Sequence, residues 1–267
     1  MDAPRQREAI MDSSVVEKFQ ADACRLNQAL PKHNLVVMHS GNGSVLDPDS
    51  GRVYIKPSGM DYDQITPRRI VQVDLATHEV FAGQCRPSVD LPHHLFLYKH
   101  MPEVRSIIHT HSNHATAFAA CLKPIPLCLT AIADEFGDEI PCTPYVSNEG
   151  DAIGRAILAH RTNSPAVLLG NHGVFAWGPS PEAALKAAVM VEDAARTVLL
   201  AMQVGQPVLI PSGEVAKWHD RYWNRYGQVS DRAESASAER GSPQPYVLPL
   251  KRPYSAVPPS DARPAAG

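Results

Sequence analysis

Residues 104–121, with the sequence VRSIIHTHSNHATAFAAC, contain the strand-to-helix transition that decides the fold. The first half is β-branched and apolar, which predicts a strand, and NHATAFAAC begins a predicted helix. Side chains two residues apart on a strand point to the same face, so His109 and His111 are expected to project together. Imidazole is a common ligand of zinc and related metals. The alternative is two histidines at a strand end that are satisfied by local hydrogen bonds.

Further elements are predicted on both sides of this segment. Apolar residues at helical spacing predict helices over residues 14–30, 91–103, 151–160 and 181–205. Pro31 is expected to end the first of these helices. Strands are expected in 53–59, in a hairpin within 68–83, and on both sides of a glycine-rich turn in 166–178. Residues 40–51 are expected to be rich in turns. Because helices and strands interleave to about residue 226, the pattern indicates one α/β domain with helices, sheet and helices in layers.

Composition predicts the boundaries of this domain and disfavours some classes of partner. We expect a frayed N-terminus over 1–13, a folded domain over 14–227 and a disordered tail over 228–267, which is rich in Ser, Pro and Ala. The net charge is −3, and no basic run favours nucleic acid or a membrane surface. The chain shows no secretory signal and no apolar stretch of about 20 residues, so no membrane span is expected. Its 5 scattered cysteines are typical of reduced thiols in a cytoplasmic protein.

A third histidine and one carboxylate could complete a metal site. His172 lies in the turn 170–173, GNHG, where glycines let the backbone approach a neighbour closely, although a loop histidine in a hairpin is the alternative. Asp90 precedes a predicted helix, and on these residues alone a helix cap is the favoured interpretation. Helical placement suggests that His93, His94 and His114 serve packing or support the site from behind.

Three polar turns could bind an anion. Such turns present backbone N–H groups and hydroxyls, and a lysine would add a positive charge; the residues are Gly41, Asn42, Lys56, Ser58, Gly59 and Ser88. The alternative is three ordinary turns. The chain has no Walker A sequence and no G-x-G-x-x-G after a strand, which disfavours a nucleotide fold.

The motifs SGNGS, IKPSG, RPSVD, IIHTHSNHA and GNHGVFAWG occur in that order. Together they resemble the class II aldolase and adducin-head family over about residues 14–227. Members of that family include L-ribulose-5-phosphate 4-epimerase and L-fuculose-1-phosphate aldolase. The resemblance implies a three-layer α/β/α sandwich with a mainly antiparallel sheet, and a homotetramer with active sites between subunits.

The resemblance also implies roles for single residues. It assigns a divalent metal, usually zinc, to His109, His111 and His172, with Asp90 at the acidic metal position, and it assigns phosphate to the three polar turns. Asp134 matches the acid/base of the epimerase, and Tyr226 stands where the aldolase has a Tyr-Gly. Three features depart from the epimerase: Val89 replaces a serine, Ile132 replaces a histidine, and the ending Y-Y-G-Q is absent.

The implied activity is epimerisation of L-ribulose 5-phosphate through retro-aldol cleavage to an enediolate, followed by aldol addition on the other face. The alternatives are an aldolase that cleaves a sugar 1-phosphate such as L-fuculose 1-phosphate, and a non-catalytic adducin-like interaction module. Retention of all three histidines argues against the third.

Overall fold

The computed structural model describes residues 13–81 and 85–225. Its centre is a six-stranded sheet in which every pairing is antiparallel. The strand order is β3-β2-β1-β4-β6-β5, with bounds β1 Asn42–Asp47, β2 Arg52–Ile55, β3 Val71–Asp74, β4 Ser106–Thr110, β5 Ala166–Leu169 and β6 Gly173–Gly178. The predicted α/β class and the antiparallel character of the sheet are therefore confirmed.

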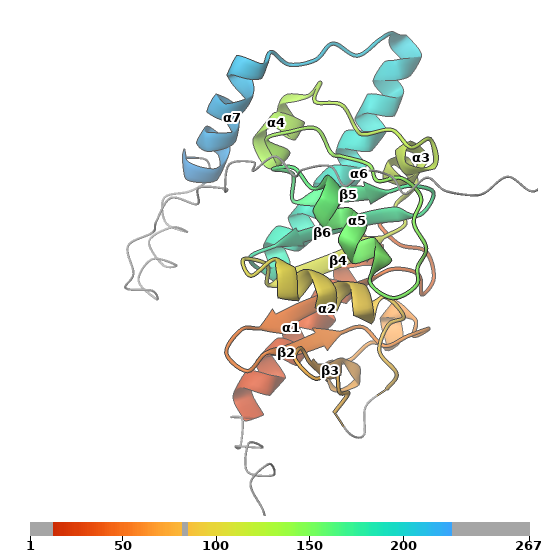
Figure 1. Ribbon diagram of the computed structural model, residues 1–267, viewed down its shortest axis with the longest axis vertical. Helices are drawn as coiled ribbons and strands as arrows, with labels where there is room; N and C mark the ends of the chain where they lie inside the picture. Colours follow the sequence, from red (N-terminus) through yellow and green to blue (C-terminus); the bar gives the residue numbers. More distant parts are fainter. Residues whose placement is uncertain (1–12, 82–84, 226–267) are drawn as a thin grey trace, which may run out of the picture. The chain divides into compact units, whose positions relative to one another are not determined.

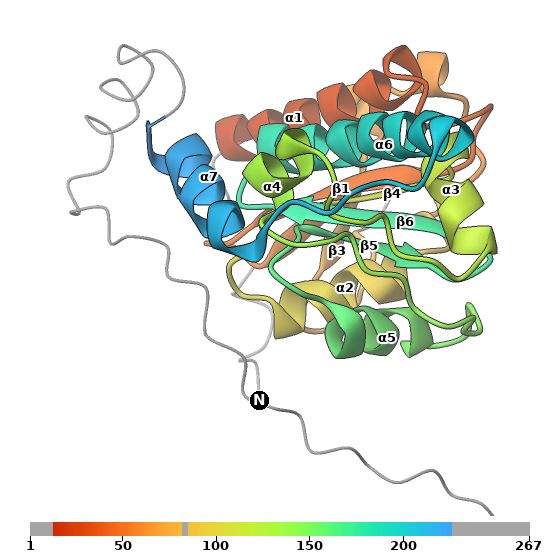
Figure 2. The same ribbon diagram turned by 90° about the horizontal axis from the view of Figure 1, so that it is seen from above.

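The described part of the chain contains seven α-helices, labelled in Figure 1. They are α1 Ser13–Lys32, α2 Leu91–His100, α3 Asn113–Ala120, α4 Thr130–Phe136, α5 Ala152–His160, α6 Pro181–Val204 and α7 Ser212–Arg225. Helices α1 and α6 lie on one side of the sheet, and α2 and α5 lie on the other (Figure 2).

Both faces of the sheet are buried, because every residue of β1, β4, β5 and β6 is buried. On β4, Ile108 packs into the core under α1 and α6, whereas Ile107 packs into the core with α2 and α5. Strand β6 alternates in the same way, since Val174 joins the first core and Phe175 joins the second. Successive side chains on a strand point to opposite faces, so His109 shares the α2 face with Ile107.

Three sequence expectations need correction. Helix α1 does not end at Pro31 but continues to Lys32, and Asn34 then takes a left-handed conformation with φ 56°, which is a common way to end a helix. The stretch expected to be turn-rich contains β1, because Asn42 and Gly43 pair with β4. Within the described residues 68–81, the expected hairpin has one full strand, β3, and its second arm pairs with β3 only through an isolated bridge between Val73 and Val80 and neighbouring backbone hydrogen bonds.

Helix α4 was not anticipated, whereas the predicted helices 91–103, 151–160 and 181–205 correspond to α2, α5 and α6. The described residues belong to one compact unit. Residues 1–12 and 226–267 lie outside the described residues, so the expected frayed terminus, the expected tail and the domain limits stay predictions. No described helix is long and apolar enough to cross a membrane.

Candidate metal centre

Three histidines converge at one end of the sheet. His109 is in β4, His111 follows the end of that strand, and His172 lies in the turn between β5 and β6. One ring nitrogen from each lies within 4.8 Å of the others, and the Nε2 atoms of His109 and His111 are 2.9 Å apart. The structure thus brings together the three residues that the sequence had indicated.

Strand pairing fixes the His109 ring. In the β4–β6 register, His109 lies opposite Phe175, and the two rings stack with centroids 4.6 Å apart. The Nδ1 atom of His109 donates a hydrogen bond to the carbonyl oxygen of Val174 at 2.9 Å. Because Nδ1 carries the proton in this bond, Nε2 presents its lone pair to the other two histidines, which is the usual arrangement of a metal-binding imidazole.

The protonation states suit cation binding. Burial lowers the pKa of His109, against an opposing effect of Asp90, and the other two imidazoles lower it further. Burial also lowers the pKa values of His111 and His172. For Asp90, burial raises the pKa, but nearby histidines and a hydrogen bond from Asn42 outweigh it, so the pKa is below its usual value. Near neutral pH the imidazoles are uncharged and the carboxylate is charged, and both are metal-binding forms.

Glycine makes the convergence sterically feasible. A Cβ atom on Gly173 would lie 2.4 Å from the Thr110 carbonyl oxygen and 2.8 Å from Cδ2 of His111. A Cβ atom on Gly41, whose φ is +73°, would lie 2.8 Å from the carbonyl oxygen of His109. Side chains at either position would push into the histidine cluster. The expectation that glycine permits a close backbone approach beside His172 therefore has a steric basis at Gly173.

Asp90 does not cap helix α2 with its side chain. It occupies the N-cap position, but it makes no side-chain cap hydrogen bond. Its Oδ2 atom instead accepts a hydrogen bond of 2.6 Å from Nδ2 of Asn42. The capping interpretation is therefore wrong. Asp90 lies outside the group of three converging residues, so its role as a fourth ligand stays a prediction.

Two of the polar turns are joined to each other. The backbone N–H of Ser88 donates to the Lys56 carbonyl oxygen at 3.0 Å, and that of Ser58 donates to the Arg86 carbonyl oxygen at 2.9 Å. Pro57 and Pro87 form an isolated bridge between the same segments. The structure therefore brings Ser88 beside the segment of Lys56 and Ser58, although the two segments are far apart in sequence.

Lys56 is buried and holds the third turn. Its Nζ atom donates to the carbonyl oxygen of His39 at 3.0 Å and lies 4.8 Å from the ring centroid of Tyr62. Burial lowers the pKa of Lys56, against an opposing effect of Asp61. The neighbouring Gly59 has φ +63° and is exposed, as Ser58 is. Phosphate binding by these turns stays a prediction.

The two proton-transfer candidates are not gathered with the histidines. Asp134 is half-buried on α4, and its carbonyl oxygen accepts a hydrogen bond of 2.9 Å from Nδ1 of His219 on α7. Among the contacts described within this one chain, none joins Asp134 to the three histidines. Tyr226 lies outside the described residues.

A buried polar chain behind the site was only partly foreseen. Oγ of Ser44 lies 2.7 Å from Nδ1 of His94 and 2.8 Å from the hydroxyl of Tyr98. His94 was expected to serve packing or support, which agrees with its complete burial. Ser44 and Tyr98 were missed because they become neighbours only when β1 packs on α2.

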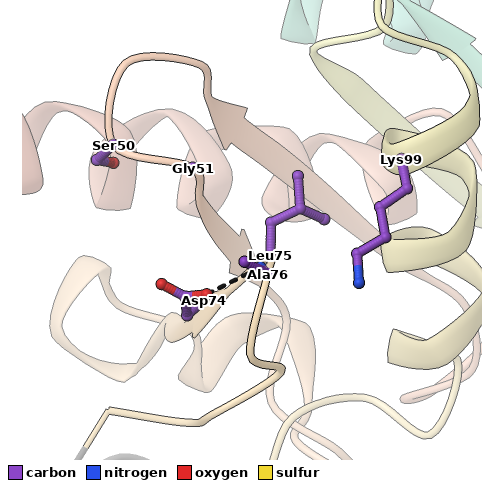
Figure 3. A pocket seen from close by; sticks show the side chains of 6 residues that line it. All are labelled: Ser50, Gly51, Asp74, Leu75, Ala76 and Lys99. Carbon is purple, nitrogen blue, oxygen red and sulfur yellow. Dashed lines mark hydrogen bonds between the residues drawn. The ribbon is translucent and has the colours of Figure 1, made fainter.

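A separate cavity of about 290 Å³ is not lined by any of the three histidines. The residues that line it are Ser50, Gly51, Asp74, Leu75, Ala76 and Lys99 (Figure 3). Asn42, at the start of β1, pairs with His109, whereas this cavity adjoins the turn after the other end of β1. Oδ1 of Asp74 accepts hydrogen bonds from the backbone N–H groups of Ala76 and Thr77, each at 2.8 Å.

The fold and this centre define an α/β protein with a three-histidine donor set of the kind that binds a divalent metal. The sequence model described as Class II Aldolase and Adducin N-terminal domain matches residues 21–199. The chain belongs to this family, as its motifs had indicated, and is a class II aldolase-family enzyme.

Individual relatives agree with the family. The chain is 34% identical over 208 residues to the Mycoplasma pneumoniae protein named "Probable L-ribulose-5-phosphate 4-epimerase UlaF", covering 73% of this chain and 86% of that protein. Among solved structures, L-fuculose 1-phosphate aldolase matches with a TM-score of 0.70 and 27% identity, covering 77% of this chain and 96% of that one. YgbL from Klebsiella pneumoniae matches with a TM-score of 0.67 and 26% identity, over 76% and 98% of the two chains.

Proposed function

We propose that this protein is a zinc-dependent epimerase of L-ribulose 5-phosphate that works by retro-aldol and aldol steps. The observation that carries the metal dependence is the convergence of His109, His111 and His172. The 34%-identical relative supports the substrate and the reaction.

The donor set fits a divalent ion. Three neutral imidazoles would hold zinc and leave a coordination position for substrate, with Asp90 close enough to His109 to influence its pKa. A bound ion of this kind supplies Lewis acidity, which stabilises negative charge on the substrate oxygens when the carbon–carbon bond breaks. The Val174 carbonyl oxygen keeps His109 in the tautomer that the site requires.

The joined polar turns are proposed to hold the phosphate group. Ser58 and Gly59 are exposed in a turn in which Gly59 has φ +63°, and the paired segment carries Ser88. Gly41 and Asn42, the first residue of β1, follow the turn that the Lys56 ammonium holds through the His39 carbonyl oxygen. A phosphate held there would keep the aldehyde fragment bound while it turns and presents its other face.

Proton transfer to the aldehyde oxygen is assigned to Asp134 and Tyr226. Because Asp134 is not joined to the histidines within one chain, we propose that both residues act on the site of a neighbouring subunit of a homotetramer. Exposed apolar side chains at the end of α6 and in the segment that leads to α7 support assembly: Val204 is 92% exposed and Val208 is 84% exposed.

The remaining assignments concern the fold class, the cellular location and the partners of the protein. The helices on both faces of the sheet support classification as a three-layer α/β/α sandwich. The five unpaired cysteines support a cytoplasmic location. The partners are a small sugar phosphate and other copies of this chain, with neither nucleic acid nor a membrane.

The second candidate is an aldolase that cleaves a sugar 1-phosphate. The structural match to L-fuculose 1-phosphate aldolase favours it. Both reactions begin with cleavage of the same kind of bond, and they differ in whether the aldehyde fragment leaves. A non-catalytic interaction module is disfavoured by the intact histidine cluster, which such a module does not need.

The test is product analysis with purified, zinc-loaded protein. L-ribulose 5-phosphate and L-fuculose 1-phosphate are supplied separately, and products are followed by NMR. Formation of the C4 epimer supports the epimerase, free aldehyde from the sugar 1-phosphate supports the aldolase, and no turnover of either contradicts both. His109→Ala should remove most of the metal and nearly all turnover, whereas His33→Ala, at an exposed histidine, should change neither.

A further inference from the structure

A carboxylate from α6 binds the first turn of α3. Oε1 of Glu192 accepts hydrogen bonds from the backbone N–H of His114 at 3.0 Å and from Nδ1 of that ring at 2.7 Å. Oε2 accepts a hydrogen bond from the backbone N–H of Ala115 at 3.0 Å. Both oxygens are therefore engaged by one helix end.

This carboxylate replaces the helix's own cap. Ser112 is the N-cap residue of α3, but its side chain makes no cap hydrogen bond, and its buried Oγ atom has no partner among the described residues. The first N–H groups of a helix have no partner within the helix, and they carry a partial positive charge that favours an anion. Glu192, only 15% exposed, meets this need from a different helix.

The position of α3 affects the backbone of His111, which lies between β4 and this helix. Strand β4 ends at Thr110, which is the last residue of its register with β6, so strand pairing does not extend to His111. Helix α3 begins at Asn113, two residues later. The backbone of His111 is thus held by β4 on one side and by α3 on the other.

We propose that Glu192 is a positioning residue of the metal centre, which fixes the direction of the His111 imidazole by anchoring the first turn of α3. The proposal rests on the proposed function in one respect, that the three histidines bind a metal. Glu192 acts from α6, which packs on the sheet face opposite the one that His109 shares with α2. Loss of groups that orient metal ligands typically weakens metal binding by about 10–100-fold.

The experiment uses Co²⁺ as the probe on the full-length protein. Glu192→Ala, Glu192→Gln and the control Asp193→Ala are compared by Co²⁺ dissociation constant, by the visible absorption spectrum of the Co²⁺-loaded protein, and by thermal midpoint in chelator. Asp193 is the next residue on α6 and is exposed, so the control removes the same charge without the contact.

Glu192→Ala should weaken Co²⁺ binding by about 10–100-fold and alter the visible spectrum. Glu192→Gln, which keeps one acceptor oxygen, should recover part of both, and Asp193→Ala should match the wild type. If Glu192→Ala does not fold, the Gln variant decides the question by the same readouts. A variant with wild-type affinity and spectrum but a lower thermal midpoint would overturn the positioning role and leave the metal centre standing. A wild type that binds no Co²⁺ would overturn the metal centre itself.

Discussion

Asn42 Nδ2 donates a hydrogen bond of 2.6 Å to Asp90 Oδ2, and so joins the first residue of β1 to the residue before α2. Asn42 also lies opposite His109 in the β1–β4 register. One buried amide therefore connects β1, which pairs with the strand of His109, to the carboxylate of Asp90, which acts to raise the pKa values of all three histidines. This contact places Asp90 where it can balance the charge of a bound cation.

The first prediction concerns this contact. Asn42→Ala should lower the free energy of unfolding by about 1.5–3 kcal/mol, because the partly buried Asp90 carboxylate loses a hydrogen bond. It should also weaken zinc binding by about 10–100-fold, because Asp90 is no longer oriented. Urea unfolding and competition with a chelator measure the two effects.

Gln72→Ala provides the control for Asn42→Ala. Gln72 is also buried, and its side chain accepts a hydrogen bond from Arg52 on the far strands of the sheet. Its loss should leave zinc affinity unchanged. An Asn42→Ala protein that keeps the wild-type zinc affinity would show that Asp90 needs no support from Asn42.

The sequence predicted the histidine centre in two steps: local spacing predicted only that His109 and His111 project together, and His172 was joined to them by the resemblance of the ordered motifs to a known family. His109 and His111 are two residues apart, and the glycines beside His172 mark a tight turn whatever lies elsewhere in the chain. The Asn42–Asp90 contact could not be predicted from spacing, because 48 residues separate the partners and the contact depends on the β1–β4 register. Helix α4 was missed because its seven residues are too few to establish helical periodicity.

The second prediction tests the steric role of Gly173. Gly173→Ala should place a methyl group against the Thr110 carbonyl oxygen and the His111 ring. Overpacking of this kind costs about 1–3 kcal/mol, and here it should also reduce zinc content by displacing a ligand. Thermal denaturation and metal analysis of the purified variant provide the measurement.

Gly213→Ala is the matched substitution. A Cβ atom there meets nothing within 4 Å, and the residue lies in α7, where alanine is favoured over glycine. Its thermal midpoint should be equal to that of the wild type or slightly higher. If Gly173→Ala kept the wild-type thermal midpoint and zinc content, close packing around Gly173 would not be necessary for the site.

The third prediction is a dependence of stability on pH. Burial lowers the pKa of His94 from 6.5 to about 3, with Asp90 acting against the shift and His93 adding to it. Between these values the unfolded chain binds a proton that the folded chain does not, so stability falls as the pH is lowered from about 6.5 towards 3. One such group contributes a slope of at most about 1.4 kcal/mol per pH unit.

The measurement is the urea-unfolding free energy of metal-free protein between pH 7.5 and pH 4.5, for the wild type and His94→Gln. The wild type should lose stability more steeply than the variant, although other buried histidines also contribute to its slope. Equal slopes would mean that His94 binds its proton equally well in the folded and unfolded protein, and that burial does not lower its pKa. His160→Gln, at a partly exposed histidine bonded to the Ala156 carbonyl oxygen, serves as the comparison.

The last prediction separates proton transfer from metal binding. Asp134→Asn should leave zinc content and thermal midpoint near the wild-type values, because Asp134 is half-buried on α4 and is not joined to the histidines within its own chain. Turnover of L-ribulose 5-phosphate should fall by about 10²–10⁴-fold, the usual contribution of a general acid or base. A drop in stability and zinc content together would indicate structural damage, and wild-type turnover would remove Asp134 from the mechanism.

Mixed oligomers then decide whether Asp134 acts across a subunit boundary. Asp134→Asn and His109→Ala proteins are each expected to be inactive, because each lacks one necessary group in every site. If a site takes its histidines from one subunit and Asp134 from another, random mixing restores both native residues to roughly a quarter of the sites. Activity should then reappear after the two variants are unfolded and refolded together. If both residues serve the site of their own subunit, no mixed oligomer contains an intact site and the mixture stays inactive. Asp134 would then be catalytic within its own subunit.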